Sequence, residues 1–294
     1  MSVTARSVWL VLGGIVSVQV GAAFAKQLFD EVTPTTMVWL RLATSTVVLV
    51  AIARPRLGGR SRSDWLVVLG FGAALLTMNW AIYQSFARMP LGLAVTIEFL
   101  GPLTIALVGS RRRLDLLWVA LAAVGVALLG FDTTGVTISG VAFALLAGAC
   151  WAAYIPLSAA TGRRWPGFSG LALASVVGAV VLAPYVLAGG GGAGGVGGDH
   201  PLLDPAVVGI GVLVGLLSSV VPYSLELAAL RTMPSHVFGI LMSLEPAAAA
   251  LAGVVLLSEL LGTVQWLAVA CVVVASVGVT RSLTATVEPP PVLG

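Results

Sequence analysis

Residues 234–259, PSHVFGILMSLEPAAAALAGVVLLSE, decide the fold. The stretch is long and apolar enough to cross a bilayer, which takes about 20 such residues. Its middle holds an ionisable side chain, Glu245, followed at once by Pro246, a residue type that interrupts helices. A carboxylate near the bilayer midplane is energetically costly, so its presence there indicates a function. We therefore predict a membrane span that carries a functional group.

A second stretch has the same design. Residues 90–111 read PLGLAVTIEFLGPLTIALVGSR, with Glu98 and Pro102 in the interior. A shift of 144 positions places Pro102 on Pro246 and aligns several of the apolar residues around them. The chain is therefore predicted to be a duplication, with one special helix in each half.

Composition places the chain in a membrane. Hydrophobic residues make up 59% of it and charged residues only 9%, whereas soluble domains are about 25% charged. The apolar runs are continuous, which favours an all-α integral membrane protein over a β-barrel with alternating residues. The net charge of +3 does not indicate nucleic-acid binding, because the basic residues lie between the apolar runs. Cys150 and Cys271 lie inside apolar runs and are expected to pack there.

Ten membrane-spanning helices are predicted, at residues 8–26, 34–53, 65–87, 90–110, 115–131, 137–160, 168–188, 205–229, 234–257 and 262–281. The first run has no convincing cleavage site and is read as an uncleaved span. Basic residues gather at alternate ends of the spans, namely Arg6, Arg54, Arg56, Arg60, Arg62, Arg111, Arg112, Arg113, Arg163, Arg164, Arg231 and Arg281. By the positive-inside rule, both termini are then cytoplasmic.

Each half of the duplication holds five spans, over residues 8–131 and 137–281. Because five is odd, the second half is predicted to run inverted relative to the first, around a central cavity. Inverted repeats place a substrate site near the midplane between them. The glycine-rich residues 188–199 are predicted to be a flexible external loop, and residues 283–294 a disordered cytoplasmic tail.

Several polar residues are expected at similar depth in the membrane. A helical rise of about 1.5 Å per residue puts Glu98 about 12 Å and Glu245 about 17 Å into their spans. The full set comprises Glu98, Glu245, Arg41, Gln19, Asn79 and Trp151. Two alternatives stay open at this point. Arg41 forms only an internal ion pair with a glutamate, or the two amides only join helices by hydrogen bonds.

The two prolines give a further hint of a site. Proline has no N–H to donate to the carbonyl four residues earlier. Pro102 would thus free the carbonyl of Glu98, and Pro246 that of Met242. We predict a helix break and an exposed backbone acceptor in each copy, with a packing kink as the alternative.

Tyr223 is also assigned to the substrate site, whereas Glu226 and Lys26 are assigned with less support. Glu226 and Tyr223, near the cytoplasmic end of their span and next to a proline, are expected to line an inner vestibule. Lys26 lies near the outer surface, where its long side chain can reach water. It is interpreted as an anchor, with an external gate as the alternative.

No enzyme is predicted. The only histidines, His200 and His236, lie in or beside connections on opposite sides, so a histidine-based metal site is not expected. There is no phosphate-binding glycine loop before a soluble helix and no nucleophile with an evident base. We therefore expect no metal and no cofactor.

Several stretches resemble a known family. GACWAAYI (148–155) and SLEPAAAALAGVVLLSE (243–259) look like the EamA-type repeats of the drug/metabolite transporter superfamily. The chain is similar over most of its length to the bacterial threonine/homoserine exporters, in QVGAAFAKQLF (19–29), VWLRLA (38–43), PLGLAVTIEFLGPL (90–103), VVPYSLELAALRTMP (220–234) and FGILMSLEPAAAALAG (238–253). The resemblance implies a multi-pass, ten-helix carrier of the bacterial inner membrane that exports threonine and homoserine with the proton gradient. The glycine-rich external loop departs from the family pattern.

The expected ligand is a small zwitterionic amino acid, with protons as the second partner and the lipid bilayer around the carrier. Both charges of a zwitterion need compensation once it leaves water. Arg41 would take the carboxylate, and Glu98 or Glu245 the ammonium. The alternative is an exporter of aromatic amino acids, drugs or other metabolites, with Trp80, Trp151 and Tyr223 lining a wider pocket. The sequence does not indicate an oligomeric state.

Overall fold

The computed structural model describes residues 5–108, 115–129, 134–190, 202, 204–230 and 232–284. The regular elements within these ranges are all helical. The helices are α1 (Ala5–Gln27), α2 (Pro34–Ala53), α3 (Arg62–Phe86), α4 (Leu91–Glu98), α5 (Leu100–Val108), α6 (Asp115–Leu128), α7 (Ile138–Gly162), α8 (Ser169–Tyr185), α9 (Pro205–Gly215), α10 (Val221–Leu230), α11 (Ser235–Met242), α12 (Glu245–Leu257) and α13 (Thr263–Thr284). Two π-helices, η1 (Val186–Gly190) and η3 (Leu216–Val220), extend α8 and join α9 to α10.

Among the described residues, eight helices are long and apolar enough to cross a membrane, which agrees with a multi-pass membrane protein. The predicted spans 90–110 and 115–131 coincide with shorter apolar helices, over Leu91–Ile105 and Leu116–Leu128. The count of ten therefore stays a prediction. Large apolar side chains cover the outside, and Leu66 and Val47 are each 70% exposed, as suits a surface in contact with lipid.

Some of the predicted segments lie outside the described residues. The glycine-rich loop does so from residue 191 onward, while residues 188–190 belong to η1 rather than to a loop. The predicted tail, 283–294, lies outside the described residues from residue 285 onward. Its first two residues, 283 and 284, belong to α13 rather than to a tail. Arg111, Arg112, Arg113 and Arg231, which were used for the orientation, also lie outside.

Local sequence signals set several helix starts. The Thr33 side chain accepts a hydrogen bond from the Thr36 amide, and Pro34 follows at the first helical position of α2. Ser61 and Asp64 form a reciprocal capping box at the start of α3. These caps satisfy amide groups that have no partner within their own helix.

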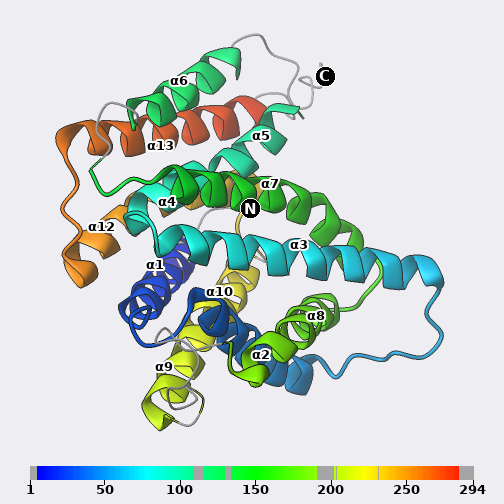
Figure 1. Cartoon of the computed structure of the whole chain (residues 1–294). Coiled ribbons are helices and arrows are strands. Elements are labelled where there is room, and N and C mark those ends of the chain that lie inside the picture. The colour runs from blue at the N-terminus through cyan, green and yellow to red at the C-terminus, as the bar shows by residue number, and fades with distance from the viewer. Residues whose placement is uncertain are drawn as a thin grey trace, which may run out of the picture.

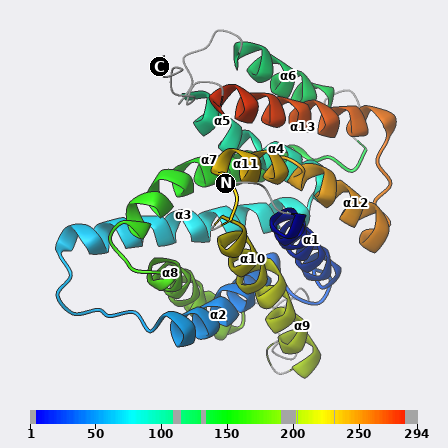
Figure 2. The same cartoon turned by 180° about the vertical axis from the view of Figure 1, so that it is seen from behind.

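The helices pack in recurring pairs. α3 lies against α7 as α10 lies against α1, and α3 lies against α8 as α9 lies against α2. α6 and α13 form a pair along the upper edge of Figure 1, and α2, α8 and α9 lie at the opposite edge, also when seen from behind (Figure 2). Such recurrence is what a two-fold relation between the halves would produce, and the inverted arrangement stays a prediction.

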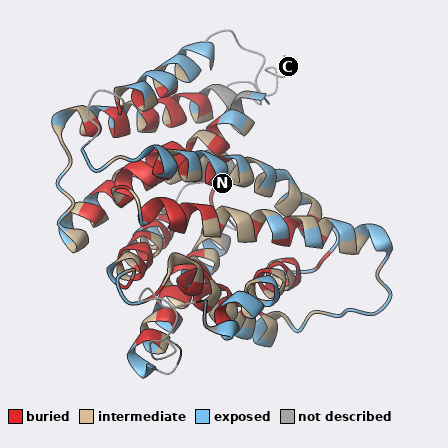
Figure 3. Cartoon of the chain, in the orientation of Figure 1, coloured by how far each residue is buried: buried red, intermediate tan, exposed pale blue. Residues whose placement is uncertain are grey.

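Buried residues gather where the helices converge. Figure 3 shows them along α1, α4 and the end of α3 that leads into α4, whereas the far end of α3 and the outer faces are exposed. Fully buried side chains there include Met37, Tyr83, Leu91 and Ile97. The connection between α12 and α13 lies at the left of Figure 1, and the connection between α2 and α3 at the right. These are the two ends of the bundle.

Both special segments are broken. α4 ends at Glu98 and α5 begins at Leu100, and α11 ends at Met242 and α12 begins at Glu245. Each proline follows its break within a few residues and cannot donate the hydrogen bond that would bridge it. The breaks place one glutamate at the end of α4 and the other at the start of α12.

Candidate functional site

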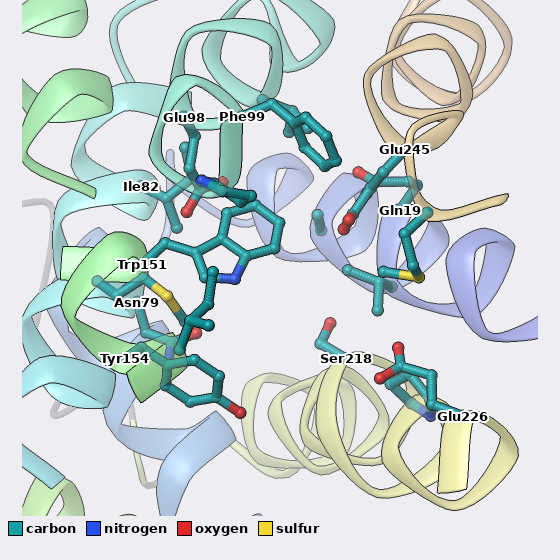
Figure 4. A pocket seen from close by; sticks show the side chains of 18 of the residues that line it. Gln19, Asn79, Ile82, Glu98, Phe99, Trp151, Tyr154, Ser218, Glu226 and Glu245 are labelled. Carbon is teal, nitrogen blue, oxygen red and sulfur yellow. The ribbon is translucent and has the colours of Figure 1, made fainter. Parts of the chain in front are cut away.

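A cavity of about 520 Å³ lies between the helices. Nine of the residues singled out from the sequence line it: Gln19, Arg41, Asn79, Glu98, Pro102, Trp151, Tyr223, Glu226 and Glu245. Figure 4 shows Glu98, Trp151, Asn79 and Tyr154 on one side of it, and Gln19, Glu245, Ser218 and Glu226 on the other. Pro246, Lys26 and Trp80 are not among its lining residues.

Arg41 is held by the π-helix η3. Its Nη2 donates to the Ser218 carbonyl at 2.8 Å and its Nε donates to Ser219 Oγ at 3.1 Å. Neither of the ion pairs found between described residues involves Arg41. The alternative that Arg41 is consumed by pairing with a glutamate is therefore wrong for this structure. The guanidinium keeps its remaining donors for another partner.

Gln19 and Glu245 form a hydrogen-bonded pair between α1 and α12. Gln19 Nε2 donates to Glu245 Oε1 at 3.3 Å. The other two oxygens of the pair, Gln19 Oε1 and Glu245 Oε2, are buried and have no partner among the described residues. Both side chains line the cavity, at 2% and 8% exposed. The pair thus leaves two buried acceptor oxygens unsatisfied, which is rare for buried groups.

Two buried hydroxyls near Arg41 are also without a partner among the described residues. They are Ser218 Oγ and Tyr83 Oη, and both residues line the cavity. The Arg41 guanidinium carbon lies 5.7 Å from the centroid of the Tyr83 ring, and Ser218 is the residue whose carbonyl binds Arg41. The Arg41 cation and the Tyr83 residue therefore lie together in the wall, whereas the Ser218 hydroxyl faces Gly21 of α1, where an added Cβ would clash with it.

The carboxyl group of Glu98 has no hydrogen bond or ion pair with another described residue, although the residue is only 8% exposed. Its backbone carbonyl oxygen faces Gly148 of α7, because a Cβ on Gly148 would lie 2.8 Å from that oxygen. The expectation that Pro102 exposes this carbonyl as an acceptor is therefore wrong. The oxygen lies in a close helix contact. The same expectation for Met242 stays a prediction.

The other predicted residues have plainer surroundings. The Asn79 amide donates 2.7 Å to the Leu75 carbonyl of its own helix, so it does not join two helices. The Trp151 ring packs edge-on against Phe99, at 5.4 Å between ring centroids. Trp80 donates to Thr35 Oγ1 and packs on Phe143, away from the cavity.

Sequence reasoning missed Tyr83, Tyr154 and Ser218 as lining residues. The two tyrosines lie in apolar runs, where an aromatic residue resembles ordinary packing. The pair Ser218-Ser219 was a usable signal, because two adjacent hydroxyls within a membrane span need partners.

Lys26 lies outside the cavity, at the end of α1. Its Nζ forms an ion pair with Glu259 at 2.5 Å and donates to the Met89 carbonyl at 2.7 Å. It is therefore not a surface anchor free in water. Glu226 lines the cavity from the middle of α10 and is half-buried, and its role in an inner vestibule stays a prediction.

Comparisons with known proteins agree with this architecture. Residues 138–281 match the EamA-like transporter family, an extent close to the predicted second repeat. The chain is 38% identical to the threonine/homoserine exporter RhtA of Escherichia coli, over 94% of this chain and 93% of that protein. It is 39% identical to RhtA of Salmonella typhimurium over the same shares. A protein of known crystal structure, 19% identical, superposes with a TM-score of 0.60 over 96% of this chain and 99% of that one, which shows the fold.

Proposed function

The chain belongs to the EamA-type transporters, in the group of the bacterial threonine/homoserine exporters, and we propose that it exports small zwitterionic amino acids such as threonine and homoserine. The membrane is the bacterial inner membrane, with both termini in the cytoplasm. Transport proceeds by alternating access between two inverted five-helix repeats, driven by the proton gradient without a cofactor.

The observation that carries this proposal is that the unpaired polar atoms of the cavity form two groups, one of hydrogen-bond acceptors and one of hydrogen-bond donors. Gln19 Oε1 and Glu245 Oε2 are acceptors, whereas the Arg41 cation and the hydroxyl of Tyr83, whose ring lies next to Arg41, can donate. A buried polar atom without a partner is costly. A ligand with an ammonium group and a carboxylate, at a fixed short separation, satisfies both sets at once.

This sorting divides the roles more finely than the sequence did. The ammonium is assigned to Gln19 and Glu245, which are joined by a hydrogen bond and each keep one unpaired oxygen. The carboxylate is assigned to Arg41, with Ser218 next to it. Charge-assisted hydrogen bonds of this kind are about twice as strong as neutral ones, which offsets the loss of the ligand's water.

Glu98 is then free for the proton. Three glutamates, Glu98, Glu226 and Glu245, face a cavity with one guanidinium. Of the two at the break points, Glu98 is the one without a hydrogen-bond partner among the described residues. A zwitterion brings no net charge, so its entry leaves this balance unchanged. We assign the exchangeable proton to Glu98 and substrate binding to Glu245.

Counterflow in proteoliposomes tests the assignment. Labelled threonine is placed outside, and unlabelled amino acids are loaded inside. Glu245→Gln removes the charge that faces the ammonium, so the apparent affinity for threonine should fall tenfold or more, an order of magnitude typical of charged hydrogen bonds. Glu98→Gln should keep exchange but abolish stimulation by a pH gradient. Glu31→Gln, an exposed carboxylate after α1, is the control.

The opposite pattern, or no exchange of threonine by the wild-type protein, would contradict the proposal. The second candidate is export of aromatic amino acids or drugs. It is favoured by the volume of about 520 Å³ and by Trp151, Tyr154 and Tyr223 in the wall. Unlabelled phenylalanine or tryptophan that drives exchange better than threonine and homoserine would favour that reading.

A further inference from the structure

The two broken segments are closed against each other at one end only. α4, the first half of one segment, packs on α12, the second half of the other. The remaining halves, α5 and α11, make no comparable contact: α5 packs on α7 and α13, and α11 on α13 and α1. The two segments therefore cross, with α4 and α12 in contact at one end and α5 and α11 apart at the other.

The closed end is packed without room to spare. A Cβ on Gly92 of α4 would lie 2.4 Å from Ala250 Cα and 2.8 Å from its amide nitrogen, so the two helices touch backbone to backbone. The residues that line the cavity toward this end, including Ala22, Phe86 and Val95, are all buried. Toward the other end the lining is mixed, because Phe238 and Glu226 are half-buried whereas Val279 of α13 is fully buried.

A charged network lies on top of the closed contact. Glu259, just beyond α12, forms the ion pair with Lys26 of α1, and its Oε2 accepts the amide hydrogen of Leu91 at 2.7 Å. Leu91 is the first residue of α4. Gly253 leaves the space for the carboxylate, since a Cβ there would lie 2.7 Å from Glu259 Oε2. One side chain therefore ties together α1, α4 and the end of α12.

We propose that Lys26, Glu259 and the first turn of α4 form the latch of the external gate, with the Gly92–Ala250 contact as the gate itself. The proposal rests on the transport function given above. Opening to the outside separates α4 from α12 and must break the ion pair and the bond to the Leu91 amide. The connection between α2 and α3, with its arginines, marks the predicted cytoplasmic end of the bundle. The latch lies at the opposite end, which is the predicted external end.

The two charged groups of the latch, Lys26 and Glu259, neutralise each other. The side chains of Lys26 and Glu259 are 19% and 15% exposed, so each would be left partly buried without its partner. Removing one charge should therefore weaken closure much more than removing an exposed charge at the same end. Glu31, an exposed carboxylate in the turn after α1, is the matched control.

The test is thiol accessibility in membrane vesicles, which needs no substrate. Ala22→Cys, in α1 one turn before Lys26, reports on the cavity just below the gate, in full-length protein with Cys150 and Cys271 replaced by serine. A membrane-impermeant thiol reagent is applied to right-side-out vesicles. Glu259→Gln and Lys26→Gln should each raise the labelling rate about five- to tenfold, within the usual range of conformational coupling. Glu31→Gln should leave it unchanged.

Unchanged labelling in both latch variants would overturn the proposal, and so would a rise seen only in inverted vesicles. Labelling of Thr280→Cys, from α13 at the other end of the cavity, should fall in inverted vesicles as the population shifts. A general loosening of the fold would raise labelling at both positions and would also count against a gate. If labelling shifts as expected but threonine is not exchanged, the gate stands and the proposed substrate fails.

Discussion

Replacing Gly101 by alanine tests the helix contact on which the position of Glu98 depends. A Cβ at Gly101 would lie 2.0 Å from the backbone oxygen of Gly148, and packed Cβ atoms essentially never approach closer than 3.0 Å. The obstacle is backbone, which cannot rotate away as a side chain can. α5 and α7 must therefore separate by at least 1 Å or bend.

Overpacking of this kind costs about 1–3 kcal/mol, which corresponds to a fall in the unfolding midpoint on the order of 5 °C. Thermal unfolding of the purified protein in detergent measures it. Gly209→Ala is the control, since a Cβ there meets nothing within 4 Å. That variant should be neutral or slightly more stable, because alanine favours helix by about 1 kcal/mol over glycine. Equal midpoints for Gly101→Ala and Gly209→Ala would refute the close contact.

Three other outcomes are expected. Arg41→Lys keeps the charge but cannot reproduce the two hydrogen bonds to η3, so the apparent KM for threonine should rise roughly tenfold or more; an unchanged KM would show that only charge matters. Gln19→Leu removes one acceptor of the ammonium and should raise KM without abolishing stimulation by a pH gradient. Trp151→Ala should change the range of competing amino acids in counterflow, whereas Trp80→Phe should not, because only Trp151 of the two lines the cavity.

The sequence predicted the broken helices from two prolines at matching positions in the two copies, Pro102 and Pro246, each of which removes one hydrogen-bond donor. A proline alone does not decide a break, because Pro156 and Pro184 lie inside the continuous helices α7 and α8. The position of Glu98 and Glu245 within apolar runs also predicted that both are buried in the membrane, and both line the same cavity.

The partners of these groups were not predictable in the same way. Arg41 binds the carbonyl of Ser218 in η3, which Pro222 leaves without the helical donor four residues later. The proline indicates a free carbonyl there, but not which side chain binds it. Lys26 pairs with Glu259, which lies 233 positions later. The sequence indicates that both residues lie at the same end of the bundle, but their contact depends on how α1, α4 and α12 converge. The orientation of the Glu98 carbonyl likewise depends on the glycine contact with α7.

The short helix α4 connects the proposed external gate with the proposed binding site. Its first residue, Leu91, is held by Glu259, and its last residue is Glu98. Seven steps of about 1.5 Å make it a rod of roughly 10 Å, and a rod this short is too stiff to bend within itself. If α4 tilts away from α12 to release the latch, Glu98 must change its surroundings in the cavity. The helix break after Glu98 allows that tilt without moving α5, which stays packed on α7. An unbroken helix would have to tilt as one body over its full length. The break confines the motion to α4, the half of the segment that joins the gate to the site.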